Sequence, residues 1–97
     1  RPMPAKKAAK AVEVTSRYPR AHGAPIHWGD PAVIGIENLG KPNFGAPTPL
    51  TNQDVPMFWA CGVTPQTIMM KSKPPLAITH SPGHMFVTDL RDEDLMA

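Results

Sequence analysis

Prolines divide this sequence into short segments. Thirteen of the 97 residues are proline and seven are glycine, and they follow no repeat or period. Because proline fixes φ and lacks a backbone N–H, it ends helices and is excluded from the middle of sheets. Since 41% of the residues are hydrophobic, the chain does not have the composition of a disordered protein. The sequence therefore predicts short helices and strands joined by fixed turns.

The size and charge of the chain exclude several classes of protein. Residues 1–97 form one domain at most, which buries only about 60–65% of its unfolded surface. No apolar run approaches the ~20 residues of a membrane-spanning helix, so we expect no membrane partner. Residues 1–20 are basic, but Tyr18 is their only aromatic residue. A nucleic-acid surface combines basic and aromatic residues, so we expect a solvated helix face and no nucleic-acid partner.

The first part of the chain predicts one helix and one long connection. Residues 4–18 have small apolar residues at i, i+3 and i+7 on one face, with Pro4 in the first turn. Pro19 ends this helix, because the residue before a proline avoids the helical region. Residues 38–54 are rich in Pro, Gly, Asn and Thr and predict an irregular connection.

The segment 55–88 contains apolar runs separated by breaks. Residues 55–60 predict a short buried strand with Pro56 at its start, and residues 66–72 predict a helix of about two turns. Residues 76–79 form a second apolar run. A strand, a helix and a second strand at this spacing predict a right-handed βαβ unit over 55–80, with parallel strands. The predicted fold class is α/β: a mixed α/β sandwich with short strands and helices and long irregular connections.

Two turns of this unit are predicted to face a shared cavity. In open α/β sheets, ligands bind beyond the carboxyl ends of the strands. Cys61 and Gly62 would lie at one such end, and His80 and Ser81 at another. Gly62 permits close approach of the backbone, and a helix start at Thr64 would direct free N–H groups at the same space. The sequence thus predicts a small anion pocket with a thiol and imidazoles at its rim.

Each of these residues also has a structural interpretation. A cysteine at the end of a strand is more often a small buried hydrophobic residue than a nucleophile. Thr64 is first of all an N-cap, which stabilises a helix by roughly 1 kcal/mol. His80 and His84 have the i, i+4 spacing of metal ligands on a helix, but the proline and glycine between them disfavour a helix. We therefore expect no metal site.

Four runs of the sequence resemble a known family. They are residues 55–66 (Val-Pro-Met-Phe-Trp-Ala-Cys-Gly-Val-Thr-Pro-Gln), residues 78–89 (Ile-Thr-His-Ser-Pro-Gly-His-Met-Phe-Val-Thr-Asp) and two shorter runs at 15–19 and 22–27. Together they resemble the D-glutamate cyclase family, whose members are also described as hydro-lyases. Family members are longer. The resemblance therefore implies that residues 1–97 are the carboxyl-terminal portion of a longer chain, with its amino-terminal remainder as partner.

The resemblance also implies a reaction, the intramolecular dehydration of D-glutamate to 5-oxo-D-proline in D-amino acid metabolism. The α-amine attacks the γ-carboxyl carbon and water leaves, and the tether between the two groups supplies their proximity. A base must take the ammonium proton, an acid must protonate the leaving hydroxide, and donors should face the oxyanion. None of these tasks requires a metal or an organic cofactor, so we expect neither.

Chemistry and position give hypothetical roles to ten residues. We expect His80 and His84 to carry out acid–base catalysis, with Asp89 as an orienting carboxylate. Cys61 is expected to be a cavity wall or a proton donor. The residues expected to bind the amino-acid substrate are Arg17 or His22, as the anchor of the α-carboxylate, and Gly62, Thr64, Gln66 and Ser81, around a carboxylate or the oxyanion.

Two other functions stay open on the sequence alone. One is a non-catalytic small-ligand-binding or structural fragment of the same fold, and the other is a hydro-lyase acting on a different small amino or hydroxy acid. The sequence sets neither the strand order nor the oligomeric state, and a homo-oligomer is compatible with it. The resemblance implies a cytoplasmic location in a bacterium or the mitochondrial matrix in a eukaryote.

Overall fold

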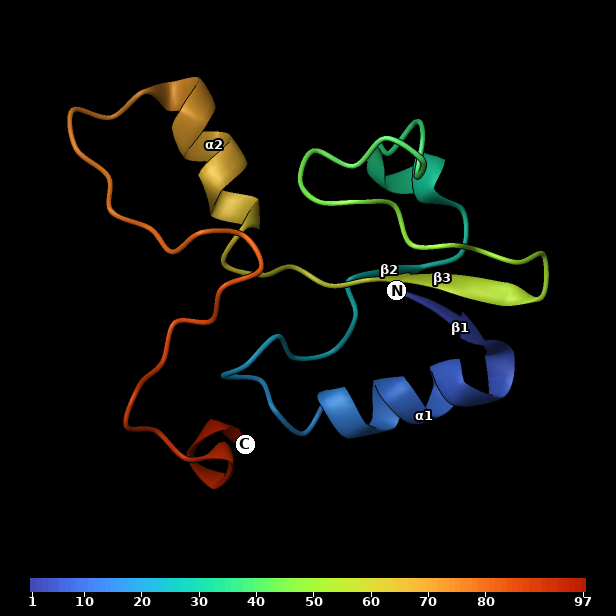
Figure 1. The fold of residues 1–97 in the computed structure, drawn as a ribbon. Coiled ribbons are helices and arrows are strands. Elements are labelled where there is room, and N and C mark those ends of the chain that lie inside the picture. The colour runs from blue at the N-terminus through green and yellow to red at the C-terminus, as the bar shows by residue number, and fades with distance from the viewer.

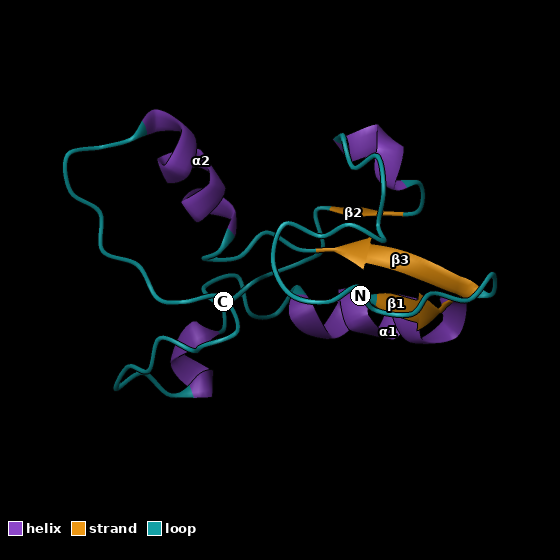
Figure 2. Cartoon of the chain, turned by 45° about the horizontal axis from the view of Figure 1, so that its top comes forward, coloured by secondary structure: helices purple, strands orange, loops and turns teal.

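A three-stranded antiparallel sheet joins the beginning and the middle of the chain. The computed structural model describes all 97 residues. The strands are β1 (Pro2–Pro4), β2 (His27–Trp28) and β3 (Asp54–Phe58), in the order β1-β3-β2. Helix α1 (Ala5–Thr15) lies along one side of the sheet, whereas helix α2 (Thr64–Ser72) lies apart from it (Figure 1, Figure 2). Short 3-10 helices cover Pro31–Ile34 and Asp92–Leu95. The expected mixed α/β class is confirmed.

Helix α1 matches the helix expected over residues 4–18 but is shorter at both ends. Pro4 has an extended backbone and precedes the helix instead of lying in its first turn. The helix ends at Thr15, and residues 16–18 continue it as hydrogen-bonded turns, in which the N–H of Tyr18 donates to the carbonyl of Thr15 over 3.0 Å. The small apolar face contacts the sheet, and Ala8 is buried there. None of the helices has both the length and the apolar character that spanning a bilayer requires.

Pro56 lies in the middle of the central strand, not at its start as expected. It is paired with Pro2 of β1. The hydrogen bonds to β1 lie beside this pair, where the N–H of Met57 donates to the carbonyl of Arg1 over 2.9 Å. The carbonyl of Pro56 faces β2 and accepts from the N–H of Gly29, one residue beyond the end of that strand. A proline is tolerated here because its missing N–H falls where the ladder ends.

The βαβ unit expected over 55–80 is not formed. After α2 ends at Ser72, residues 73–91 contain neither helix nor strand, so the apolar run at 76–79 is irregular and exposed. Both edges of β3 are occupied, by β1 on one side and β2 on the other. A run that follows α2 has no free edge of β3 with which to pair. The partners of β3 come instead from earlier in the chain, and both are antiparallel to it.

Few residues of the chain are buried. Of the 97 residues only Ala8, Pro25 and Met57 are buried, and Met57 is the only large side chain among them. The radius of gyration is 15.1 Å, larger than the ~13 Å of a compact domain of this size. Large apolar side chains after α2 face solvent, and Ile78 exposes 89% of its surface. The core is therefore confined to the contact between α1 and the sheet.

Candidate functional site

The candidate site begins at the turn between β3 and α2. The N–H of Thr64 donates to the carbonyl of Cys61 over 3.0 Å, and the N–H of Cys61 donates back to the Thr64 hydroxyl over 3.3 Å. Thr64 is already the first residue of α2, so it closes the turn and is not the N-cap that the sequence predicted. The N–H groups of Gly62 and Val63 donate no hydrogen bond within the chain. The turn therefore carries two adjacent donors that a ligand can use.

His80 lies directly against this turn. Its Nε2 atom is 2.8 Å from the point that a Cβ atom on Gly62 would occupy. The side-chain amide of Gln66, on the first turn of α2, donates to the carbonyl of His80 over 2.6 Å. This bond joins the irregular segment after α2 to the start of the helix. The expected proximity of the turn at Gly62 and the turn at His80 is thus present, although no parallel sheet produces it.

The His80 ring has one hydrogen-bonded nitrogen, Nδ1, and one nitrogen without a hydrogen bond, Nε2. Nδ1 lies 3.0 Å from the carbonyl oxygen of Ser81. A carbonyl oxygen can only accept, so Nδ1 carries the proton in a neutral ring and Nε2 has the lone pair. Nε2 is the atom on the Gly62 side. The geometry therefore presents the basic nitrogen of His80 to the turn.

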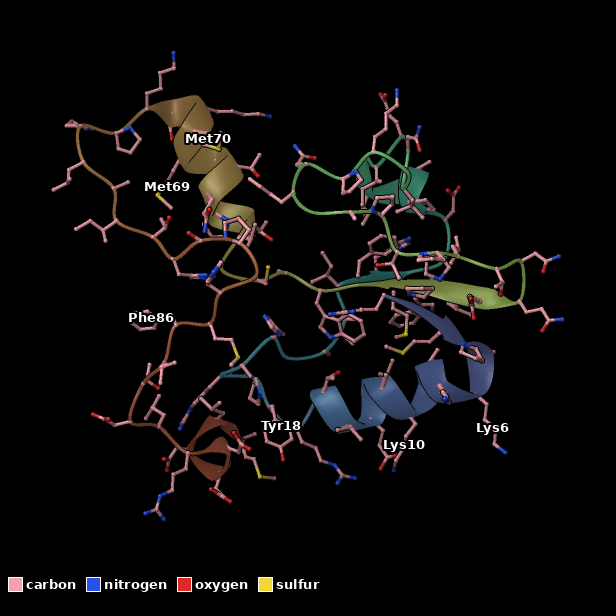
Figure 3. The ribbon with its side chains drawn as sticks, in the orientation of Figure 1. Lys6, Lys10, Tyr18, Met69, Met70 and Phe86 are labelled. Carbon is pink, nitrogen blue, oxygen red and sulfur yellow. The ribbon has the colours of Figure 1, made fainter.

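A cavity of about 350 Å³ lies at this contact. Gly62 and His80 line it together with three residues that were not predicted from the sequence, Ile78, Thr79 and Phe86. Phe86 belongs to the extended segment that follows His80 (Figure 3). Ile78 and Thr79 belong to the run at 76–79, which was expected to be a strand and is irregular. Their position within the run 78–89, which also carries His80, was the signal that could have identified them.

Cys61 and His22 lie at a different cavity. This second cavity has a volume of about 440 Å³, and both residues line it together with Trp59. The indole N–H of Trp59 donates to the carbonyl of Gly23 over 3.0 Å, which holds the segment around His22 against the end of β3. Cys61 is half-buried and carries a free thiol. Cys61 directly precedes Gly62, which the His80 imidazole approaches. The thiol and the imidazole nevertheless line separate cavities.

The remaining predicted residues lie away from both cavities. The guanidinium of Arg17 binds the carboxylate of Glu13 on the exposed side of α1, at 2.7 Å. His84 is exposed, and its Nδ1 atom lies 3.2 Å from the carbonyl oxygen of Pro82. Asp89 is exposed and forms no ion pair or hydrogen bond, so it does not orient either histidine in this structure. Nowhere do three His, Cys, Asp or Glu side chains gather as a metal site would require.

Comparison with known proteins identifies, along almost the whole chain, the family that the sequence motifs resemble. The sequence profile of the family described as D-glutamate cyclase matches residues 1–89. A protein of Stutzerimonas stutzeri (strain A1501) that carries the name "Putative hydro-lyase" is 62% identical over 95 residues, which cover 98% of this chain and 36% of the relative. A similarly named protein of Geobacillus kaustophilus (strain HTA426) is 59% identical over 95 residues, which cover 98% of this chain and 36% of the relative. Another, of Bacillus subtilis (strain 168), is 56% identical over 95 residues, which cover 98% of this chain and 37% of the relative.

The chain therefore spans little more than a third of the length of the curated relatives that it matches. The match includes both runs that form the candidate site, the turn at 61–64 and the segment around His80. With a family profile that matches 1–89 and relatives near 60% identity over nearly every residue, this chain belongs to the D-glutamate cyclase family.

Proposed function

We propose that the protein is a hydro-lyase that cyclises D-glutamate to 5-oxo-D-proline with loss of water. The observation that carries this proposal is the contact between the His80 ring and the turn at Gly62, beside a cavity of about 350 Å³. Sites for small molecules range from ~300 to 1,000 Å³, so a small amino acid is a suitable occupant. The names of the relatives support a hydro-lyase, and the description of the family supports D-glutamate as the substrate.

In the proposed mechanism, His80 Nε2 acts as the base that takes a proton from the substrate ammonium group. The amine then attacks the γ-carboxyl carbon, so that a carbon–nitrogen bond forms and one carbon–oxygen bond breaks. The nitrogen loses two protons in all, and both end on the leaving oxygen, which departs as water. His80 carries one of them, and solvent water is proposed to carry the other, because His84 is exposed and lies outside the cavity. Proton transfer by a positioned side chain contributes about 10²–10⁴ in rate.

The turn before α2 supplies the proposed electrostatic stabilisation. Negative charge develops on the γ-carboxyl oxygens as the amine attacks. The N–H groups of Gly62 and Val63 have no partner within the chain, and backbone N–H groups are common donors in oxyanion holes. Cys61, the residue before them, lines the neighbouring cavity and has no part in this step.

The substrate has two carboxylates, and the cavity at His80 has no positively charged side chain among its lining residues. Arg17 is engaged with Glu13 on α1, and His22 lies at the neighbouring cavity. We therefore propose that the anchor of the α-carboxylate comes from outside residues 1–97, in a chain of the length of the relatives, which we call the full-length form. In this proposal the amino-terminal remainder of that form is the partner that completes the site.

The experiment that tests the proposal follows the loss of water from D-glutamate by mass spectrometry, with the full-length form as the enzyme. We expect 5-oxo-D-proline as the product. The variant His80→Gln should lower turnover about 10²–10⁴-fold, since it removes the base but keeps a polar group of similar length. His27→Gln is the matched control, because His27 binds the carbonyl of Asp30 and lies outside both cavities, and a glutamine amide can still donate there.

Three results would contradict parts of this proposal. Normal turnover in a folded His80→Gln variant would remove His80 from the mechanism. Loss of water from another small amino or hydroxy acid, but not from D-glutamate, would change the substrate and keep the hydro-lyase. If the full-length form dehydrated none of these acids, the alternative of a non-catalytic binding or structural module would be favoured.

A further inference from the structure

Helix α1 and the sheet enclose an apolar groove that no part of this chain fills. The groove has a volume of about 460 Å³, and all of its lining residues are hydrophobic. Two of these lining residues, Ala8 and Met57, are buried. Ala5, Ala9 and Val12 line it from α1, at the i, i+4 and i+7 positions of one helix face. Their short side chains leave room for apolar groups from elsewhere.

The groove has an exposed aromatic residue at its edge. Trp28 of β2 lines the groove, yet 56% of its surface is exposed. The opposite side of α1 is charged, and Lys6 and Lys10 point away from the sheet (Figure 3). A continuous apolar surface beside a charged one is typical of a site that another segment of polypeptide covers.

We propose that this groove receives an apolar segment of the full-length form that lies outside residues 1–97. The relatives extend over nearly two thirds of their length beyond the region that this chain matches, so polypeptide to fill the groove exists in them. Only three residues of the present chain are buried, which is too few for a core of its own. A covering segment within the same polypeptide also has a high effective concentration.

A second copy of the chain fits the groove less well, because of the charge on α1. A two-fold symmetric contact through the groove would place α1 beside itself. This helix carries Lys6, Lys7 and Lys10 against a single acidic residue, Glu13. The lysines lie outside the groove, so in such a contact they would stand at its rim, where the like charges of the two copies still oppose association.

The test measures the accessibility of single cysteines in the full-length form, in a Cys61→Ser background. Ala9→Cys places a thiol in the groove, and Lys6→Cys places one on the charged side of the same helix, where Lys6 has no ion pair. We expect maleimide to label the groove cysteine about tenfold or more slowly than the Lys6→Cys control under native conditions, and at the same rate after unfolding. Ala5→Cys, also in the groove, serves as a second variant should Ala9→Cys fail to fold.

Equal native labelling rates for the groove cysteines and the Lys6→Cys control would overturn the proposal. Protection that disappears on dilution would also overturn it, because the groove would then be covered by a second copy. Protection that is independent of concentration supports it. None of these readouts depends on catalysis, so the outcome is separate from that of the proposed reaction.

Discussion

The ring of His80 occupies the space that a side chain at position 62 would need, with Nε2 at 2.8 Å from the place of a Gly62 Cβ atom. These two residues belong to segments on either side of α2, and the bond from Gln66 to the His80 carbonyl holds the segments together. Gly62 does not have a positive φ, so its backbone alone would allow other residues. A side chain at position 62 would therefore disturb the position of the imidazole and not the backbone of the turn.

This relationship predicts that Gly62→Ala displaces the His80 ring but does not unfold the protein. The atom that would meet the new methyl group is the far end of a side chain, which can rotate away at little cost. If His80 is the catalytic base, a displacement of about 1 Å should lower kcat/KM roughly 10²-fold. The measurement compares kcat/KM with the midpoint of urea unfolding in the full-length form. We expect the midpoint to change little.

Gly40→Ala is the control for this variant. Gly40 also lacks a positive φ, and a Cβ there would lie 3.1 Å from the side-chain oxygen of Asn38, far along the chain from the site. It should leave kcat/KM unchanged. An equal loss of activity in both alanine variants, or none in Gly62→Ala, would show that the His80–Gly62 contact has no catalytic role.

Thr64 is predicted to stabilise the turn before α2 through its hydroxyl. In Thr64→Val the N–H of Cys61 loses its acceptor, which lies at 3.3 Å in the present structure. A net loss of about 0.5–1.5 kcal/mol in the free energy of unfolding is expected for one hydrogen bond. Thr67→Val is the matched control in the same helix, since the Thr67 hydroxyl forms no hydrogen bond. Chemical denaturation of both variants measures the difference, and equal values would contradict this role for Thr64.

The elements that the sequence predicted correctly are those set by local interactions. Helix α1 follows from small residues on one face and from prolines at both ends, and β3 follows from a short apolar run. The pairing of strands is different, because it depends on residues far apart in the chain. β1 is three residues long and β2 only two, so neither has enough length for an alternating pattern to identify it. Residues 22–28, which contain β2, are compatible with a loop or a short strand, and β1 gives no signal, so the apolar run after α2 was predicted to pair with β3.

The candidate site was predicted only in part, because it too depends on contacts between residues far apart in the chain. The approach of Gly62 and His80 was expected from a parallel sheet that does not exist, whereas its actual cause is the bond from Gln66 to the His80 carbonyl. A hydrogen bond from a glutamine side chain to a distant carbonyl cannot be predicted from the pattern of apolar and polar residues. The assignment of Cys61 and His22 to a neighbouring cavity depends likewise on how Trp59 binds the carbonyl of Gly23.

Gln66 is predicted to act as a positioning residue for His80. Gln66→Leu keeps the size of the side chain but removes the 2.6 Å hydrogen bond to the His80 carbonyl. We expect the free energy of unfolding to fall by about 0.5–1.5 kcal/mol. We also expect kcat/KM to fall and the NMR chemical shifts of the His80 ring to change. A purely structural residue would lower the stability without moving that signal. An unchanged ring signal with reduced activity would therefore contradict the positioning role.

The ion pairs of Glu13 predict how the stability of α1 depends on pH. The hydrogen bond from Lys10, with the positive charges of Lys10 and Arg17, holds the pKa of Glu13 below its ordinary value of 4.5. Because the pKa is lower in the folded state, the stabilisation is complete above the ordinary value and is lost as the pH falls through the folded-state pKa.

Glu13→Gln should therefore lower the thermal unfolding midpoint at neutral pH and have a diminishing effect below about pH 4.5. Glu37→Gln is the control, since Glu37 forms no ion pair. High salt should reduce the effect of Glu13→Gln at neutral pH, because the carboxylate is fully exposed and its partners are screened. A difference between the native protein and Glu13→Gln that persists unchanged in acid would mean that the contribution of this side chain is not electrostatic.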